Sequence, residues 1–171
     1  MNGFFALLAR VLRDPVGVVE TTDDPVVLQQ RIPHLLAMAA GGAALFGVVV
    51  GSYRGGLQVP YAAIKMPLLL WVPVMLTLPA TRALWAATGE EVSWRRTSVA
   101  GLVAMARMGV LAAAAGPALW LVYSVQPDYH FSVLLLAASL VVVGLPGLTV
   151  LMRALPRRGI RTVVAGVASL V

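Results

Sequence analysis

Long apolar stretches alternate with short polar ones along the chain. Four of them, at about 32–51, 59–80, 98–123 and 131–152, are each long enough as a helix to cross a hydrocarbon core of about 30 Å at about 1.5 Å per residue. A further apolar stretch, 160–171, is too short to cross the core on its own. The pattern therefore predicts an all-α, polytopic transmembrane helical bundle with four full spans and a partial fifth.

The first 31 residues follow a different pattern. Apolar side chains there can share one helical face, with two arginines at its boundary: Phe4, Phe5, Leu8, Val11 and Leu12, then Arg10 and Arg13. This pattern is typical of an amphipathic helix lying in the headgroup region. Asp14-Pro15 ends that helix, and Asp24 before Pro25 predicts the N-cap and first position of a new one. We expect a cytoplasmic segment at 1–31 and the bundle at 32–171.

The composition places the chain in a membrane. Hydrophobic residues make up 60% of it and charged residues 12%, and the mean hydropathy is +0.88, which excludes a soluble domain of this size. There is no cysteine, and the two histidines, His34 and His130, are too few and too far apart for a zinc site, so no cofactor is expected. Twelve of the thirteen basic residues are arginine, which indicates a GC-rich bacterial genome.

The basic residues predict the orientation. With alternating spans, one side of the membrane holds ten arginines: Arg10, Arg13, Arg31, Arg82, Arg95, Arg96, Arg153, Arg157, Arg158 and Arg161. The other side holds Arg54 alone. The positive-inside rule then predicts a multi-pass protein of the bacterial inner membrane with a cytoplasmic N-terminus. Within this inner set we expect four arginines to contact anionic lipids: Arg153, Arg157, Arg158 and Arg161.

Three prolines interrupt the second span. Pro67, Pro73 and Pro79 each lack a backbone N–H and free a carbonyl one turn back, which hydrocarbon cannot satisfy but a neighbouring helix or a water-filled cleft can. We therefore expect the stretch from Tyr53 to Ala80 to lie inside the bundle, with the chain organised around it.

Small residues in the first span predict close helix packing. Residues 39–47 read AAGGAALFG, and such residues let another helix approach tightly. Gly47 and Gly51 stand in a GxxxG register at the very end of the span, which we interpret as close packing rather than a dimer motif. Gly55-Gly56 then marks the reversal into the second span.

Lys65 is the first of two basic residues inside spans. It lies six residues from the outer end of the second span, within reach of the outer headgroups or of Asp128, the single acid on that side. One interpretation is a structural ion pair or a lysine snorkelling to the headgroups. The other is a site for an anionic headgroup or substrate.

Arg107 is the second basic residue inside a span. It lies about ten residues, or ~15 Å, into the third span. An arginine at that depth costs at least about 2.5 to 3.5 kcal/mol on insertion scales, and no span contains an acid to neutralise it. Its charge must be met by carbonyls that prolines free, by water, by lipid phosphate drawn inward, by an acidic group on another subunit, or by a transported anion.

One stretch resembles a known family. Its motif is an aromatic-x-Gly-Gly turn, a glutamine, then a lysine and a proline opening the second helix: Tyr53, Gly55, Gly56, Gln58, Lys65 and Pro67. Over about thirty residues this is similar to small bacterial five-helix membrane proteins resembling the Yip family. The resemblance implies an all-helical bundle, a cytoplasmic N-terminus and a fifth span near the C-terminus. It carries no agreed biochemical activity.

The sequence lacks the patterns that enzymes of several classes carry. There is no HExxH, P-loop, GxGxxG or GxSxG, and no serine has a histidine at a suggestive spacing. We therefore predict a non-enzymatic accessory or structural subunit of a bacterial inner-membrane complex. Its partners would be other integral membrane subunits or a second copy, together with anionic lipids and no nucleic acid. The alternative is a small anion or lipid-headgroup transporter or channel that uses Lys65 and Arg107.

Overall fold

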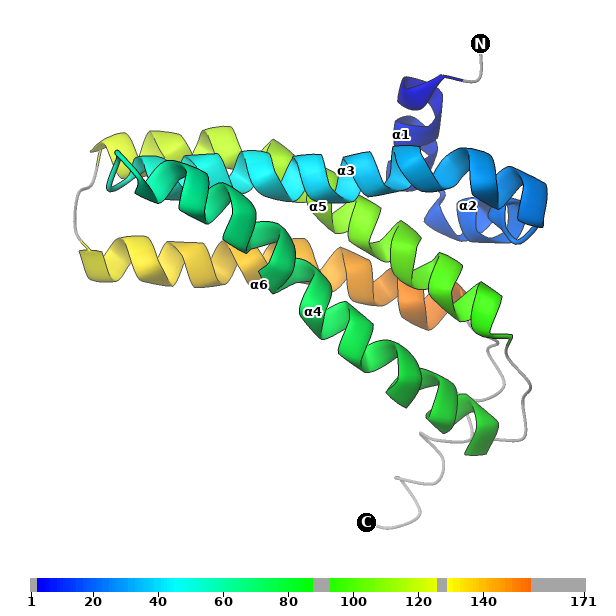
Figure 1. The fold of residues 1–171 in the computed structure, drawn as a ribbon. Coiled ribbons are helices and arrows are strands. Elements are labelled where there is room, and N and C mark those ends of the chain that lie inside the picture. Colours follow the sequence, from blue (N-terminus) through cyan, green and yellow to red (C-terminus); the bar gives the residue numbers. More distant parts are fainter. Residues whose placement is uncertain (1–2, 88–92, 126–128, 155–171) are drawn as a thin grey trace.

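The computed structural model describes residues 3–87, 93–125 and 129–154, which form six helices and no strand (Figure 1). Two are short: α1 (Phe4–Arg13) and α2 (Pro15–Thr22). Four are long: α3 (Pro25–Ser52), α4 (Gln58–Ala87), α5 (Trp94–Val125) and α6 (Tyr129–Ala154). Each long helix is long and apolar enough to cross a membrane, which confirms the all-α bundle with four full spans. The partial fifth span, 160–171, lies outside the described residues.

The helix boundaries near the N-terminus follow the predicted caps. Asp14 separates α1 from α2 and accepts a hydrogen bond from the Gly17 N–H at 3.0 Å. Asp24 caps α3 by accepting from the Val26 N–H at 2.8 Å, with Pro25 in the first turn. Because α3 begins at Pro25, it runs through the predicted boundary between 1–31 and 32–171, and that division of the chain stays a prediction.

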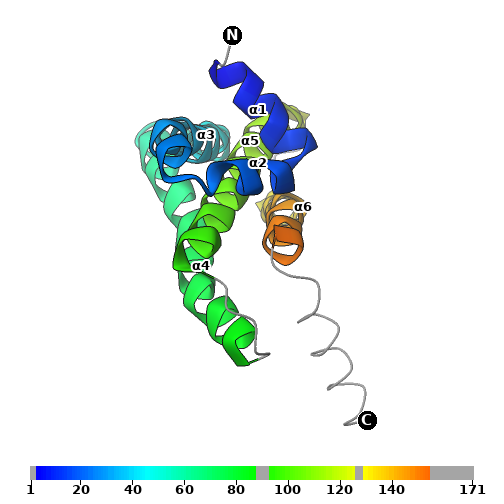
Figure 2. The same ribbon diagram turned by 90° about the vertical axis from the view of Figure 1, so that its right-hand side faces the viewer.

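The central helix is α5, which packs against all five of the others. In Figure 2 it lies between α3 and α6, and α4 packs against α3 and α5. The expectation that the stretch from Tyr53 to Ala80 lies inside the bundle is wrong, because 61% of the apolar window of α5 is buried against 22% for α4. The buried face of α5 contains Ala100, Ala104 and Ala112, small residues that let neighbouring helices approach closely.

Helices α3 and α5 cross where two glycines meet. A Cβ on Gly42 would overlap the carbonyl group of Gly109, and a Cβ on Gly109 would lie 2.6 Å from the carbonyl oxygens of Met38 and Ala39. Both contacts are with backbone, which cannot move aside as a flexible side chain can. The small residues at 39–47 therefore allow a close crossing, as predicted.

The approach of α3 to α4 depends on the next two glycines. A Cβ on Gly47 would overlap the Ala62 carbonyl, and one on Gly51 would lie 2.6 Å from the Val59 Cα. The GxxxG register thus packs within the chain, as predicted. The reversal between the two helices passes through Gly55 and Gly56, whose φ angles of 70° and 58° favour glycine.

We predict that Gly42→Ala lowers the free energy of unfolding by about 1 to 3 kcal/mol, because the methyl group forces two backbones apart. Reversible unfolding in mixed detergent micelles measures this value. Gly41→Ala is the matched control, since a Cβ on Gly41 meets nothing within 4 Å. Equal unfolding energies for the two variants would show that the crossing tolerates a wider separation.

Candidate functional site

The two short helices pack onto the side of the bundle. Figure 2 shows α2 between α3 and α6, in front of α5. Val11, Val18 and Val19 are buried with 0 to 2% exposure, whereas Phe5 remains 80% exposed. The amphipathic helix predicted near residues 4 to 13 thus forms, and part of its apolar face covers the protein.

Arg107 reaches the end of α1. Its Nη2 donates a hydrogen bond to the Leu12 carbonyl oxygen at 3.4 Å. Carbonyls in the last turn of a helix lack a backbone donor and carry the negative end of the helix dipole, so they suit a cation. A carbonyl is among the partners that the sequence allowed, but this one is free because α1 ends, and not because a proline removes its donor. Arg107 Nε is buried without a hydrogen-bond partner among the described residues.

Two further arginines tie the N-terminal segment to the bundle. Arg31 Nη1, on α3, donates to the hydroxyls of Thr21 and Thr22, both at 2.8 Å. Arg95 Nε, on α5, forms an ion pair with Asp23 at 3.0 Å. That pair is partly exposed and contributes at most about 1 kcal/mol. Sequence reasoning missed these contacts, although the run Thr21, Thr22 and Asp23 offers oxygen acceptors directly before α3.

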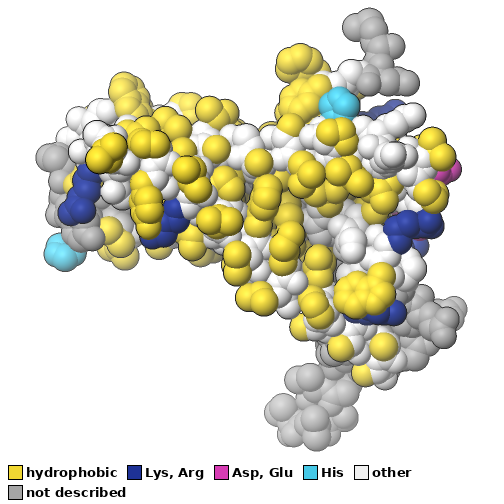
Figure 3. Space-filling view, viewed as in Figure 1, with side chains coloured by type: hydrophobic (Ala, Val, Ile, Leu, Met, Phe, Trp, Pro, Cys, Tyr) yellow, Lys and Arg dark blue, Asp and Glu magenta, His cyan; other side chains and the backbone are white. Residues whose placement is uncertain are grey.

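A groove of about 620 Å³ runs between α1 and α3. Its lining includes apolar and polar side chains: Phe4, Leu7, Arg10, Gln30, Arg31 and His34. A smaller cavity of about 290 Å³ continues past Arg10 between α1 and α2, beside Asp14 and Thr21. Neither cavity was predicted from the sequence. On the face shown in Figure 3, a histidine and basic side chains lie beside the base of α1, while the visible acidic side chains lie at the right-hand edge.

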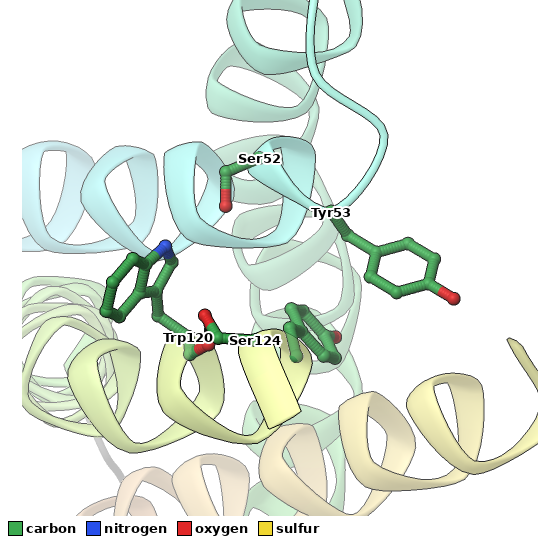
Figure 4. Close-up of a pocket in the computed structure, with 5 residues that line it drawn as sticks. Ser52, Tyr53, Trp120 and Ser124 are labelled. Atoms are coloured by element: carbon green, nitrogen blue, oxygen red, sulfur yellow. Dashed lines mark hydrogen bonds between the residues drawn. The ribbon is translucent and has the colours of Figure 1, made fainter. Parts of the chain in front are cut away.

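The opposite end of the bundle carries an aromatic pocket of about 360 Å³. Ser52 and Tyr53 line it at the end of α3, and Trp120, Tyr123 and Ser124 line it from α5 (Figure 4). The Tyr53 and Tyr123 rings lie 5.1 Å apart. Both serine hydroxyls donate to carbonyls of their own helices, at 2.7 and 2.9 Å. The aromatic rings suit the membrane–water interface.

Other residues of the turn motif have simpler surroundings. Gly55 and Gly56 form the turn itself, and Gln58 is exposed at the start of α4. Lys65 is exposed, with its Nζ 5.8 Å from the Tyr61 ring centre, a cation–π contact.

Several predicted contacts remain predictions. Asp128 lies outside the described residues, so its ion pair with Lys65 is not described. Arg153 is exposed in the last turn of α6, and the other three arginines expected to contact anionic lipids lie beyond the described part: Arg157, Arg158 and Arg161. Within the described residues, no three His, Cys, Asp or Glu side chains come close enough together to hold a metal ion.

No family model matches the chain, and no curated protein or solved structure is significantly similar to it. The resemblance to Yip-like five-helix proteins therefore stays a prediction. What the structure does describe is an N-terminal pair of helices held to the bundle by three arginines, beside a groove with basic side chains.

We predict that Arg107→Met loosens α1. Hydrogen bonds to charged groups contribute about 1.5 to 3 kcal/mol, so the amide hydrogens of α1 should exchange about tenfold faster or more. Hydrogen exchange followed by mass spectrometry measures this rate for peptides covering residues 4–13. Arg13→Met is the control, because Arg13 is exposed and its side chain makes no hydrogen bond to a described residue. Unchanged exchange in Arg107→Met would mean that apolar packing alone holds α1.

Proposed function

We propose that the chain is a non-enzymatic accessory or structural subunit of a bacterial inner-membrane complex, with other integral membrane subunits as its partners. The observation that carries this proposal is the exposed, proline-containing face of α4.

One narrow stripe of α4 is buried within the chain. Ala62, Met66, Leu70 and Val74, spaced four residues apart, have 5 to 8% exposure and face α3 and α5. After Val74 no described side chain of α4 is buried. In Figure 1 this second half of α4 diverges from α3. The part of α4 after Val74 is thus a long helical surface that is open to contact with lipid or with another protein.

The exposed surface is not purely apolar. Pro73 and Pro79 have no N–H, so the carbonyls of Leu69 and Met75 lack their normal helical donors. All four residues are exposed. An unsatisfied carbonyl in hydrocarbon costs several kcal/mol, and membrane helices with interior prolines normally pack where neighbouring groups satisfy the freed carbonyls. A helix of another subunit would supply both the cover and the polar contacts.

The distribution of charge supports the proposed orientation. Figure 3 shows basic side chains at both ends of the bundle with apolar side chains between them. The C-terminal ends of α4 and α6 and the N-terminal end of α5 lie at the same end of the bundle as α1 and α2 (Figure 1). Most of the arginines predicted to be cytoplasmic belong to these segments. By the positive-inside rule, this grouping of arginines supports the proposed cytoplasmic N-terminus.

The transport alternative requires Lys65 and Arg107 to line one path. Neither residue lines any of the three cavities described above. Arg107 is instead bonded to the Leu12 carbonyl. The accessory role is therefore the function that the geometry supports better.

We predict that Leu76→Trp removes most of the co-purifying membrane subunits. Leu76 is 71% exposed on α4, and a tryptophan there would keep a neighbouring helix from packing closely. Extraction in mild detergent at native abundance, affinity purification and mass spectrometry of the intact assembly measure the loss. Val142→Trp on α6, at a site with 66% exposure, is the matched control and should retain the partners.

A chain that purifies only with copies of itself would contradict the accessory role. Anion flux in reconstituted vesicles, lost in Arg107→Leu, would then support the transport alternative.

A further inference from the structure

Two arginines line the groove between α1 and α3. Arg10 comes from the last turn of α1 and Arg31 from α3, and each acts unfavourably on the other through its charge. Within the part of the chain that the structure describes, no acidic residue lines this groove. The ion pair between described residues joins Arg95 to Asp23 and includes neither Arg10 nor Arg31. Two cations brought together without an acid form a site that favours an anion.

Arg31 is held in place before any ligand arrives. Its Nη1 is fixed by two threonine hydroxyls at 2.8 Å, which orients the guanidinium. A guanidinium has five N–H donors, so the remaining ones can serve an oxyanion. Asp14, in the neighbouring cavity, already accepts the Gly17 N–H as a helix cap. Arg10 makes no side-chain hydrogen bond or ion pair with a described residue and can turn toward the groove.

The rest of the groove is suited to a lipid. Phe4, Leu7 and Val27 provide an apolar wall beside the arginines, and the Phe4 ring lies 6.1 Å from the His34 ring. The groove lies where α3 passes from the polar run ending at Arg31 to the apolar stretch that starts at Ile32. Lipid phosphates occupy that boundary in a bilayer, and acyl chains begin just below it.

We propose that the groove between α1 and α3 binds an anionic phospholipid, with its phosphate between Arg10 and Arg31 and the start of an acyl chain along Phe4 and Leu7. A zwitterionic lipid is a poorer ligand, because none of the described residues that line the groove has a carboxylate to receive its ammonium group. This site is distinct from the arginines after α6, and it does not depend on the proposed accessory role.

The test uses the full chain, delipidated in a neutral detergent, and native mass spectrometry with added phosphatidylglycerol or phosphatidylcholine. The double variant Arg10→Gln/Arg31→Gln should bind phosphatidylglycerol about tenfold more weakly or worse. Arg13→Gln/Arg54→Gln removes the same charge from exposed positions outside the groove and should bind like the unaltered chain. Because Arg31 also holds Thr21 and Thr22, Arg10→Gln alone gives a test that leaves those contacts intact.

Three results would overturn the proposal. The first is equal binding of phosphatidylglycerol by the groove variants and the charge-matched control. The second is equal binding of phosphatidylcholine and phosphatidylglycerol by the unaltered chain. The third is full displacement of phosphatidylglycerol by millimolar inorganic phosphate, which would identify a free phosphate site. Weaker phosphatidylglycerol binding in Leu7→Ser, with no change in inorganic phosphate binding, would support a lipid occupant.

Discussion

The close crossing of α3 and α5 at Gly42 and Gly109 is the constraint on which the rest of the structure depends. In hydrocarbon, apolar side chains gain nothing from leaving lipid, so helices associate through close contact rather than through the hydrophobic effect. The two glycines bring backbone against backbone. This contact places α5 at the centre of the bundle, with α3 and α6 packed against it. Helix α4 packs against α3 at Gly47 and Gly51.

Around this crossing, arginines on the long helices connect to the N-terminal segment. Arg31, Arg95 and Arg107 each contact oxygen acceptors in the first 23 residues, so cations on the long helices hold the short ones. The contact of Arg107 shows how a membrane helix can carry a charge without a carboxylate. Backbone carbonyls at the end of a helix provide partial negative charge at a much lower desolvation cost than a buried acid.

Features encoded locally could be predicted from the sequence. Apolar length predicted the four spans, Asp24 and Pro25 predicted the start of α3, and Gly55-Gly56 predicted the turn. The central helix could not be predicted, because all four spans are apolar and hydropathy does not say which faces meet. The partner of Arg107 left no signature either, since every residue carries a carbonyl. The groove was missed because Arg10 and Arg31 belong to different helices.

The hydrogen bond between Arg107 and Leu12 joins residues 95 positions apart. It can form only after the ribosome has made α5. The ribosome makes α1 and α2 before α3 and α4, and the α5 surface that they pack against is made after all four. Until α5 has been made, α1 can pack on α2 and α3 but lacks its contacts with α5, including the bond from Arg107 to the Leu12 carbonyl. Helix α1 is thus made well before its contact with α5 can form.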